Sequence, residues 1–245
     1  MAGHSAHDRL LRKLESITAL SSEEADALRR LPITLTNLDA DADVVREGDR
    51  PSRCCLLVDG FLFRYITLPE GGRQITSLHV PGDMPDLQTL HVEVMDHSLG
   101  VLAPSTVAFI PHAAILDLVE RHPGIASALW RDTLVDAAIF REWIANVGGR
   151  SAYQRAAHLM CEFFYKMKAV GLAKDDGCHF PLTQREMGDA LALSVVHVNR
   201  TLQQLRGEGL IVLKAKYLTI PSWEALKQAG GFNPTYLHVT PRAAA

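Results

Sequence analysis

Cysteine is scarce in this sequence, and its few copies are not spaced as metal sites or disulfide frameworks usually are. Four cysteines in 245 residues are too few for a disulfide scaffold, and no two are separated by the two residues typical of structural zinc and iron–sulfur sites. We therefore expect a protein of a reducing compartment. The cysteines are Cys54, Cys55, Cys161 and Cys178.

Long hydrophobic runs are missing as well. No apolar run reaches the ~18 to 20 residues that a membrane-spanning helix needs. The first eight residues carry no basic cluster leading into an apolar stretch, which is the pattern of an export signal. We expect neither membrane insertion nor export, and hence a cytoplasmic protein with no membrane partner.

The chain also lacks the short motifs of common enzymes. It contains no G-x-S-x-G nucleophile turn, no glycine-rich loop that cradles phosphate and no H-E-x-x-H zinc motif. We therefore expect no enzymatic activity and name no catalytic residue.

Positive charge is in slight deficit overall but is concentrated in one part of the chain. The sequence has 25 Lys and Arg against 28 Asp and Glu, a net charge of −3. Residues 150–220 hold ten basic and six acidic residues, a balance of +4, whereas residues 1–149 carry −8 and residues 221–245 carry +1. This asymmetry indicates that one domain meets a polyanion and the other does not.

The first half of the chain reads as two short helices followed by a β-rich domain. Leucines at three- and four-residue steps, and then a serine cap followed by two glutamates, predict two helices over residues 8–30. From about residue 33 to 111, short β-rich runs at roughly ten-residue spacing alternate with glycine turns, which is typical of an antiparallel sandwich or barrel. The expected strands are Cys54–Val58, Phe61–Leu68, Gln74–Val80 and Gly100–Ile110.

A long helix is predicted over Pro123–Val147, because proline opens it and Gly148-Gly149 closes it. Residues 129, 133, 136, 140, 143 and 147 follow a 4-3-4-3-4 spacing and form one broad stripe, with Leu134, Ala137 and Ile144 alongside. The stripe either packs on its own β-domain or forms a homodimer seam, and we favour the seam. The expected dimer residues are Leu129, Phe140, Trp143 and Val147.

Residues 180–206 carry the pattern of a helix-turn-helix. Thr183 and Glu186 match an S/T-x-x-E capping box that starts a helix at Gln184. Shortly afterwards Ser194 is a second N-cap, and Val198, Thr201, Leu202 and Leu205 give the next helix a buried side. The following segment, 209–220, reads as a hairpin, which we interpret as a wing. An ordinary helical hairpin with a solvated basic face is the alternative, and the wing and the local positive charge favour a DNA reader.

A second helix of this kind reads bases with its exposed N-terminal residues when it lies in a major groove. Arginine pairs with guanine, asparagine with adenine, and valine methyls contact thymine methyls. Helix N-termini and lysines in the wing are suited to phosphates. The expected DNA-binding residues are Thr183, Gln184, Arg185, Ser194, Val195, Val196, His197, Asn199, Arg200, Lys214 and Lys216.

From about residue 10 to 220, this order of elements resembles the Crp/Fnr family of bacterial transcription regulators. The landmarks are Arg46–Asp49, Leu57–Gly60, Pro81–Asp83 and Thr183–Leu205, the last with a Ser-x-x-x-Val-x-Arg pattern at Ser194, Val198 and Arg200. The resemblance implies an α+β fold: a cyclic-nucleotide-binding-like antiparallel β-roll, jelly-roll-like, over residues 1–111, a connecting and dimerisation helix over 112–149, a winged helix-turn-helix over 150–222 and a C-terminal tail over 223–245. It also implies a homodimer that binds double-stranded DNA and RNA polymerase.

Two positions of the helix-turn-helix depart from the family pattern. Members that read a TTGA-type half-site usually have glutamate where this chain has Val196, and a valine cannot accept a hydrogen bond from a cytosine amino group. We therefore expect a different site. The turn glycine is replaced by Ala192, which costs about 1–2 kcal/mol if that residue is left-handed and does not exclude the motif.

The effector is not apparent from the sequence. Relatives that bind cyclic AMP hold its phosphate with an Arg-Ser pair, and this chain has His97-Ser98 instead, so we expect cyclic AMP not to be the effector. Relatives with an iron–sulfur centre have an N-terminal cysteine cluster, and residues 1–30 contain no cysteine. Candidate residues for an effector pocket are Asp83, Asp86, His97 and Ser98.

A rival interpretation is a metal-binding, cupin-like β-barrel enzyme with a helical appendage. His79, His91 and His97, with Asp83 and Asp86, are its candidate ligands, because imidazole is the commonest metal ligand in proteins. No H-x-H or H-x-x-x-H spacing supports it, so we expect no metal site. Cys54 and Cys55 are adjacent on an expected strand, point to opposite faces and are interpreted as small buried apolar residues.

Overall fold

The computed structural model describes residues 5–239, which divide into two compact units. Among the described residues, the first unit is made of residues 5–65 and Leu78–Ala137, together with residues 238–239. The second contains Ile66–Ser77 and Ala138–Leu237. Within the described residues, no helix is both long and apolar enough to cross a membrane.

Two short capped helices open the first unit, as the sequence predicts. Ser5 and Asp8 form a capping box at α1, and Ser21 and Glu24 form one at α2. The buried leucines of α1 and α2 pack into a core cluster with one face of the sheet. The helices are α1 (Ala6–Glu15) and α2 (Ser22–Arg29).

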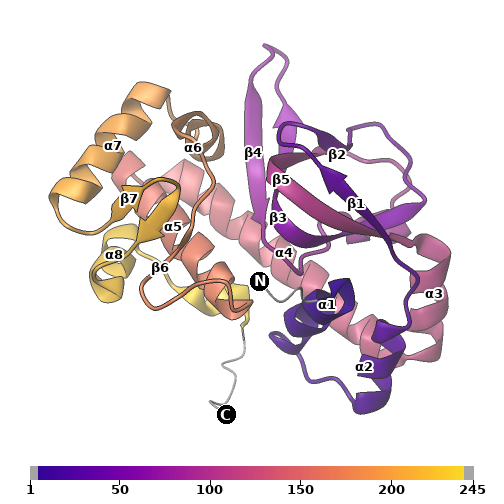
Figure 1. Cartoon of the computed structure of the whole chain (residues 1–245). Helices are drawn as coiled ribbons and strands as arrows, with labels where there is room; N and C mark the ends of the chain where they lie inside the picture. Colours follow the sequence, from indigo (N-terminus) through magenta and orange to yellow (C-terminus); the bar gives the residue numbers. More distant parts are fainter. Residues whose placement is uncertain (1–4, 240–245) are drawn as a thin grey trace. The chain divides into compact units, whose positions relative to one another are not determined.

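An antiparallel sheet forms the body of the first unit (Figure 1), although most of its edge strand β4 lies in the segment Ile66–Ser77 that is grouped with the second unit. Its strand order is β1-β5-β3-β4, with β2 pairing the end of β5, so β5 is the central partner of three strands. Cys54 contributes to the cluster on one face and Cys55 to the cluster on the other, which confirms the alternation predicted for these residues. The elements are β1 (Thr34–Leu38), β2 (Asp43–Val45), β3 (Arg53–Thr67), β4 (Arg73–His79), the short helix η1 (Leu87–Leu90) and β5 (Ser98–Pro111).

One turn predicted from the sequence is wrong. We expected Asp59-Gly60 to separate two strands, but β3 continues through it with shifts of register against β5. Gly60 has φ of +89°, and a Cβ there would lie 2.2 Å from the Ser105 hydroxyl oxygen, so the glycine marks a bulge rather than a turn. The glycine turn expected between Phe61–Leu68 and Gln74–Val80 is confirmed at residues 70–72 and joins β3 to β4.

The long helix α4 (Pro123–Gly149) follows α3 (His112–Arg121), as expected, but two of its expected dimer residues face their own chain. Leu129 and Trp143 are each only 7% exposed. Leu129 belongs to the core of the first unit, and Trp143 donates a hydrogen bond to Glu162 within the second. Phe140 and Val147 are half-buried. Leu129 and Trp143 therefore contribute to the chain's own packing, and the dimer seam stays a prediction.

The second unit is mostly helical, with a three-stranded sheet of order β6-β8-β7 (Figure 1). Strands β7 and β8 form the hairpin predicted over 209–220, and β6 adds a strand that the sequence did not indicate. Two further helical segments occupy residues 223–237, where we expected only a tail. The elements are α5 (Ala152–Ala169), β6 (Gly177–His179), α6 (Gln184–Leu191), α7 (Val195–Gly207), β7 (Val212–Lys214), β8 (Tyr217–Thr219), α8 (Trp223–Gly230) and η2 (Pro234–Leu237).

Candidate nucleic-acid interface

Helices α6 and α7 are joined by a tight turn whose geometry is set by three residues. The Thr183–Glu186 capping box starts α6 as predicted. Ala192 ends it in the left-handed region, with φ of +53°, and the Leu193 N–H then donates to the Gly188 carbonyl at 3.1 Å. A Cβ at position 188 would lie 2.6 Å from the Leu193 carbonyl oxygen, so only glycine permits this close approach.

Helix α7 has the buried side that the sequence predicts. Val198, Thr201, Leu202 and Leu205 are its buried residues, and the Ser194 hydroxyl caps its start by accepting from the His197 N–H at 3.3 Å. The helix is therefore packed along one side and anchored at its N-terminus. The opposite side of the helix is therefore held in a fixed orientation, and it is not covered by the described part of the chain.

That remaining side is solvent-exposed over its first two turns. Val195 and Val196 are 48% and 63% exposed, which is unusual for valines on a helix, and His197, Asn199 and Arg200 are exposed too. The Asn199 amide donates to Gln184 Oε1 on α6 at 3.2 Å, which orients both side chains. The side chains expected to read bases thus project from one helix end.

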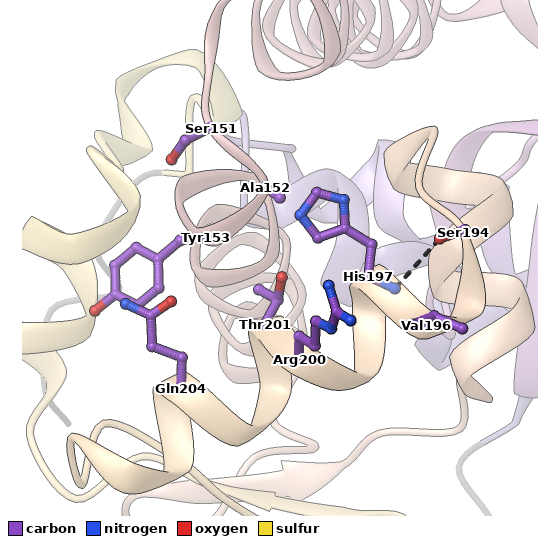
Figure 2. A pocket seen from close by; sticks show the side chains of 9 residues that line it. All are labelled: Ser151, Ala152, Tyr153, Ser194, Val196, His197, Arg200, Thr201 and Gln204. Carbon is purple, nitrogen blue, oxygen red and sulfur yellow. Dashed lines mark hydrogen bonds between the residues drawn. The ribbon is translucent and has the colours of Figure 1, made fainter.

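A groove of about 450 Å³ runs along α7 and reaches the start of α5 (Figure 2). In Figure 2, His197 and Arg200 extend from α7 beside the first turn of α5. Both helices begin with a serine cap at this groove, Ser151 for α5 and Ser194 for α7. Free N–H groups at two helix starts, together with a guanidinium, favour an anion here. The lining residues are Ser151, Ala152, Tyr153, Ser194, Val196, His197, Arg200, Thr201 and Gln204.

Sequence reasoning missed the contribution of α5 to this groove. A signal was present, because Ser151 and Gln154 form an S-x-x-Q capping box and so mark a helix start. What the sequence does not indicate is that this start lies beside α7. Tyr153 is oriented there by a hydrogen bond from its hydroxyl to Glu208.

The predicted wing is present and ends in a basic tip. Ala215 and Lys216 both have positive φ, 50° and 58°, which matches the two-residue turn of a tight hairpin. Lys214 and Lys216 are exposed. The Phe180 N–H donates to the Lys216 carbonyl at 2.8 Å, so the tip is tied to the segment that precedes α6.

The two aspartates expected in an effector pocket are buried and already hydrogen-bonded within the first unit. Asp83 Oδ1 accepts from Lys13 Nζ at 2.6 Å. Both oxygens of Asp86 accept from the Cys55 N–H, at 2.8 and 3.0 Å. Burial raises the pKa of Asp86 to about 7.

The other two residues of that expected pocket also have internal partners. His97 Nδ1 lies 2.6 Å from Asp96 Oδ1, and Ser98 Oγ accepts from the Glu47 N–H at 3.1 Å. Sequence reasoning missed Arg64, a buried arginine on β3 whose positive charge lowers the pKa of His97 after the larger effect of burial. Arg64 donates to Asp136 on α4 at 2.9 Å.

The rival metal site finds no support in the part of the chain that is described. No group of three His, Cys, Asp or Glu side chains there is placed to hold a metal ion. His79 and His97 are buried while His91 is exposed. The three histidines of that interpretation do not form one cluster.

Two family models match the chain. One, described as a Crp-like helix-turn-helix domain, matches residues 154–229, and the other, described as a cyclic nucleotide-binding domain, matches residues 35–122. Together they cover the helix-turn-helix with its wing and the sheet of the first unit.

Similar proteins and structures agree with these matches. The transcriptional activator protein FnrL of Cereibacter sphaeroides is 24% identical over 219 residues, which are 87% of this chain and 86% of that protein. The fumarate and nitrate reduction regulatory protein of Escherichia coli is 22% identical over 212 residues, 86% of this chain and 84% of that protein. The structure of FixK2 from Bradyrhizobium japonicum superposes with a TM-score of 0.73 at 21% identity, and covers 81% of this chain and 98% of that one.

Proposed function

The chain belongs to the Crp/Fnr family of DNA-binding transcription regulators, and from that premise we propose that it binds a two-fold symmetric DNA site as a homodimer, with α7 of each copy in a major groove. The observation that carries this proposal is the exposed N-terminal half of α7, which is capped and packed from behind and presents polar and methyl groups outward.

Base recognition is assigned to the exposed residues of α7. Arg200 provides paired donors that match a guanine edge, Asn199 provides an amide that matches adenine, and the methyls of Val195 and Val196 suit thymine methyls. Because position 196 has no carboxylate, a cytosine amino group finds no acceptor there. The half-site is therefore expected to differ from the TTGA type.

Phosphate contacts are assigned to helix starts and to the wing. Thr183 and Ser194 stand at the N-termini of α6 and α7, and Arg185 is exposed on the first turn of α6. Lys214 and Lys216 extend the positive charge to the hairpin tip. Such contacts position the protein on the duplex without reading its sequence.

The dimer is proposed to form through a different face of α4 from the one first expected. Trp130, Leu134 and Ile144 are 65%, 50% and 73% exposed. At about 100° per residue they lie within a stripe roughly 80° wide, with Ala137 between them. A second copy of the same helix, related by a two-fold axis, covers such a stripe with an identical one.

The remaining assignments follow from the family and from chemistry. We propose RNA polymerase as a protein partner, no enzymatic activity, and action in the cytoplasm where bacterial DNA lies. The β-roll is proposed not to respond to cyclic AMP, because its buried arginine pairs with a carboxylate of α4. Millimolar cyclic AMP should leave the melting temperature unchanged, whereas a ligand at 100 times its Kd would add about 2.7 kcal/mol to the free energy of unfolding.

Selection from a pool of randomised duplexes tests the proposed function. Purified protein should enrich a palindrome with half-sites about 34 Å apart, one turn of DNA. Recovery of no motif, or of a single non-repeated half-site, would contradict the proposal.

Light scattering on the free protein tests the dimer face. The wild-type chain should have the mass of a dimer at micromolar concentration, and Leu134→Glu should shift it to a monomer by placing charge in the seam. Leu116→Glu is the matched control, since Leu116 is 40% exposed but lies on α3. A wild-type monomer that stays monomeric with DNA, or a Leu134→Glu dimer, would refute this seam.

A further inference from the structure

The C-terminal segment of the second unit, residues 222–237, is docked on α5 rather than extended. Phe232 stacks edge-on against the His158 ring with centroids 5.2 Å apart, and Trp223 lies 5.5 Å from Phe164. At Gly230, a Cβ would lie 2.7 Å from the His158 backbone nitrogen, so α8 approaches α5 as closely as backbone allows. This segment is a packed part of the unit.

A buried carboxylate joins this segment to the end of α4. Glu162 on α5 is 2% exposed. Trp143 Nε1 on α4 donates to its Oε1 at 2.9 Å, and the Tyr236 hydroxyl on η2 donates to its Oε2 at 2.6 Å. Burial raises the pKa of Glu162, because the charged carboxylate loses its contact with water. Each of the two donors therefore matters to this carboxylate.

A second set of contacts runs beside the first. His158 Nε2 lies 3.2 Å from the Tyr236 hydroxyl and 3.6 Å from Glu142 Oε1 on α4. Arg150, at the junction of α4 and α5, donates to the same Glu142 oxygen at 2.6 Å. Tyr236 thus touches both side chains of α5 that reach back to α4.

The network continues from the junction to the helix-turn-helix. Arg155 Nε donates to the Arg150 carbonyl at 2.9 Å, and its Nη1 donates to the carbonyl of Leu191, the last residue of α6, at 3.1 Å. The junction itself contains Gly148 and Gly149, and a Cβ at either would meet nothing within 4 Å. Close packing does not require these glycines, so they leave the backbone of the junction free to bend.

We propose that residues 222–237 act as a strap across the α4–α5 junction, and that Tyr236 and Glu162 are positioning residues for DNA recognition. By fixing α5 on the last turns of α4, the strap sets the angle between α4 and α7. In a dimer joined through α4, that angle determines the distance between the two copies of α7. This inference rests on the proposed dimeric function and adds the part of the chain that sets its half-site spacing.

Loss of the strap should change DNA binding in a way that a loss of stability alone would not. Binding to one half-site needs only an intact α7, whereas binding to both half-sites needs the two α7 helices at the correct separation. Removing the Tyr236 hydroxyl frees the junction but leaves the reading face unchanged. The affinity for a full site should fall while the affinity for a half-site is kept.

The experiment measures binding of Tyr236→Phe to three kinds of duplex: a full palindrome, a single half-site, and palindromes with the half-sites moved by one base pair in either direction. We expect about tenfold weaker binding to the full site, the loss anticipated for a hydrogen bond to a charged group, with half-site binding unchanged and the spacing preference flattened. Tyr65→Phe is the matched control, because it removes a hydroxyl that also bonds a carboxylate, Asp43, in the first unit.

Glu162→Gln is the conservative test of the same link. Its amide still pairs with the Tyr236 hydroxyl, so we expect it to keep the spacing preference that Tyr236→Phe loses. Unchanged binding of Tyr236→Phe to all duplexes, or equal losses on full and half-sites, would overturn the strap. If the wild-type protein itself shows no preference for a palindrome over a half-site, the proposed function fails first, and the role of the strap in recognition fails with it.

Discussion

The charged residues of α7 face solvent, whereas those inside the β-roll are buried in ion pairs. On α7, Arg200 and its neighbours face solvent at the edge of an open groove. In the β-roll, Lys13 is tied to Asp83 and Asp132, and Arg64 to Asp136. Side chains that face outward are available to a partner, whereas paired and buried ones stabilise the chain that holds them. The comparison therefore assigns recognition to the second unit and internal support to the charges of the first.

The largest expected effect is the loss of a buried ion pair in the β-roll. Lys13→Met leaves two largely buried aspartates without their cation, which should lower the free energy of unfolding by about 3–5 kcal/mol. Arg29→Met is the control, because it breaks an exposed pair with Asp26 and should cost at most about 1 kcal/mol. Denaturant titration measures both, and equal effects would show that the buried charges do not support the fold.

On α7 the corresponding change should leave stability intact and weaken DNA binding. Arg200→Ala is expected to lose about 1–3 kcal/mol of binding free energy and to relax the preference at one base position of each half-site. Fluorescence anisotropy with matched and substituted duplexes measures both effects. Lys168→Ala removes an exposed positive charge at the far end of α5 and serves as control. Full affinity and specificity in Arg200→Ala would contradict the placement of α7 in the major groove of DNA.

How far the sequence predicted these features differs between the two units. The helix-turn-helix was predicted almost residue by residue, because its signals are local: the caps at Thr183 and Ser194 and the spacing of the buried residues of α7. Arg64 was missed because the fold places it beside Asp136, 72 positions further along the chain. The strap was missed because nothing local shows what α8 packs against. The sequence does not single out one face of α4 for a dimer, because apolar residues cover more than one face of that helix and only the structure shows that Leu129 and Trp143 are buried.

A pH titration sharpens the comparison at Asp86. Its pKa in the folded state is about 7, above the ordinary value of 3.8, so the folded form gains from keeping the proton. The contribution of this proton to the free energy of unfolding is fully present below about pH 4. It is lost as the pH rises towards 7, by at most about 1.4 kcal/mol per pH unit. Asp86→Asn should gain stability relative to wild type over this window, and a difference independent of pH would contradict the assignment.

The smallest effect is expected at the tip of the wing. Lys216→Ala should weaken binding by a similar factor for every DNA sequence and reduce the slope of log affinity against log salt by about 1, because one phosphate contact is lost. Affinity measured at several salt concentrations gives the slope. A change confined to one base position would instead make Lys216 a base reader.

Hydrogen exchange with and without a cognate duplex tests the central contrast most directly. We expect DNA to slow exchange over residues 183–200 and at the wing tip, while the strands of the β-roll, including β3 with Arg64, and the loop that holds Asp83 and Asp86 exchange as before. Protection of those strands without any protection of residues 183–200 would contradict it and would move the DNA-binding surface to the first unit.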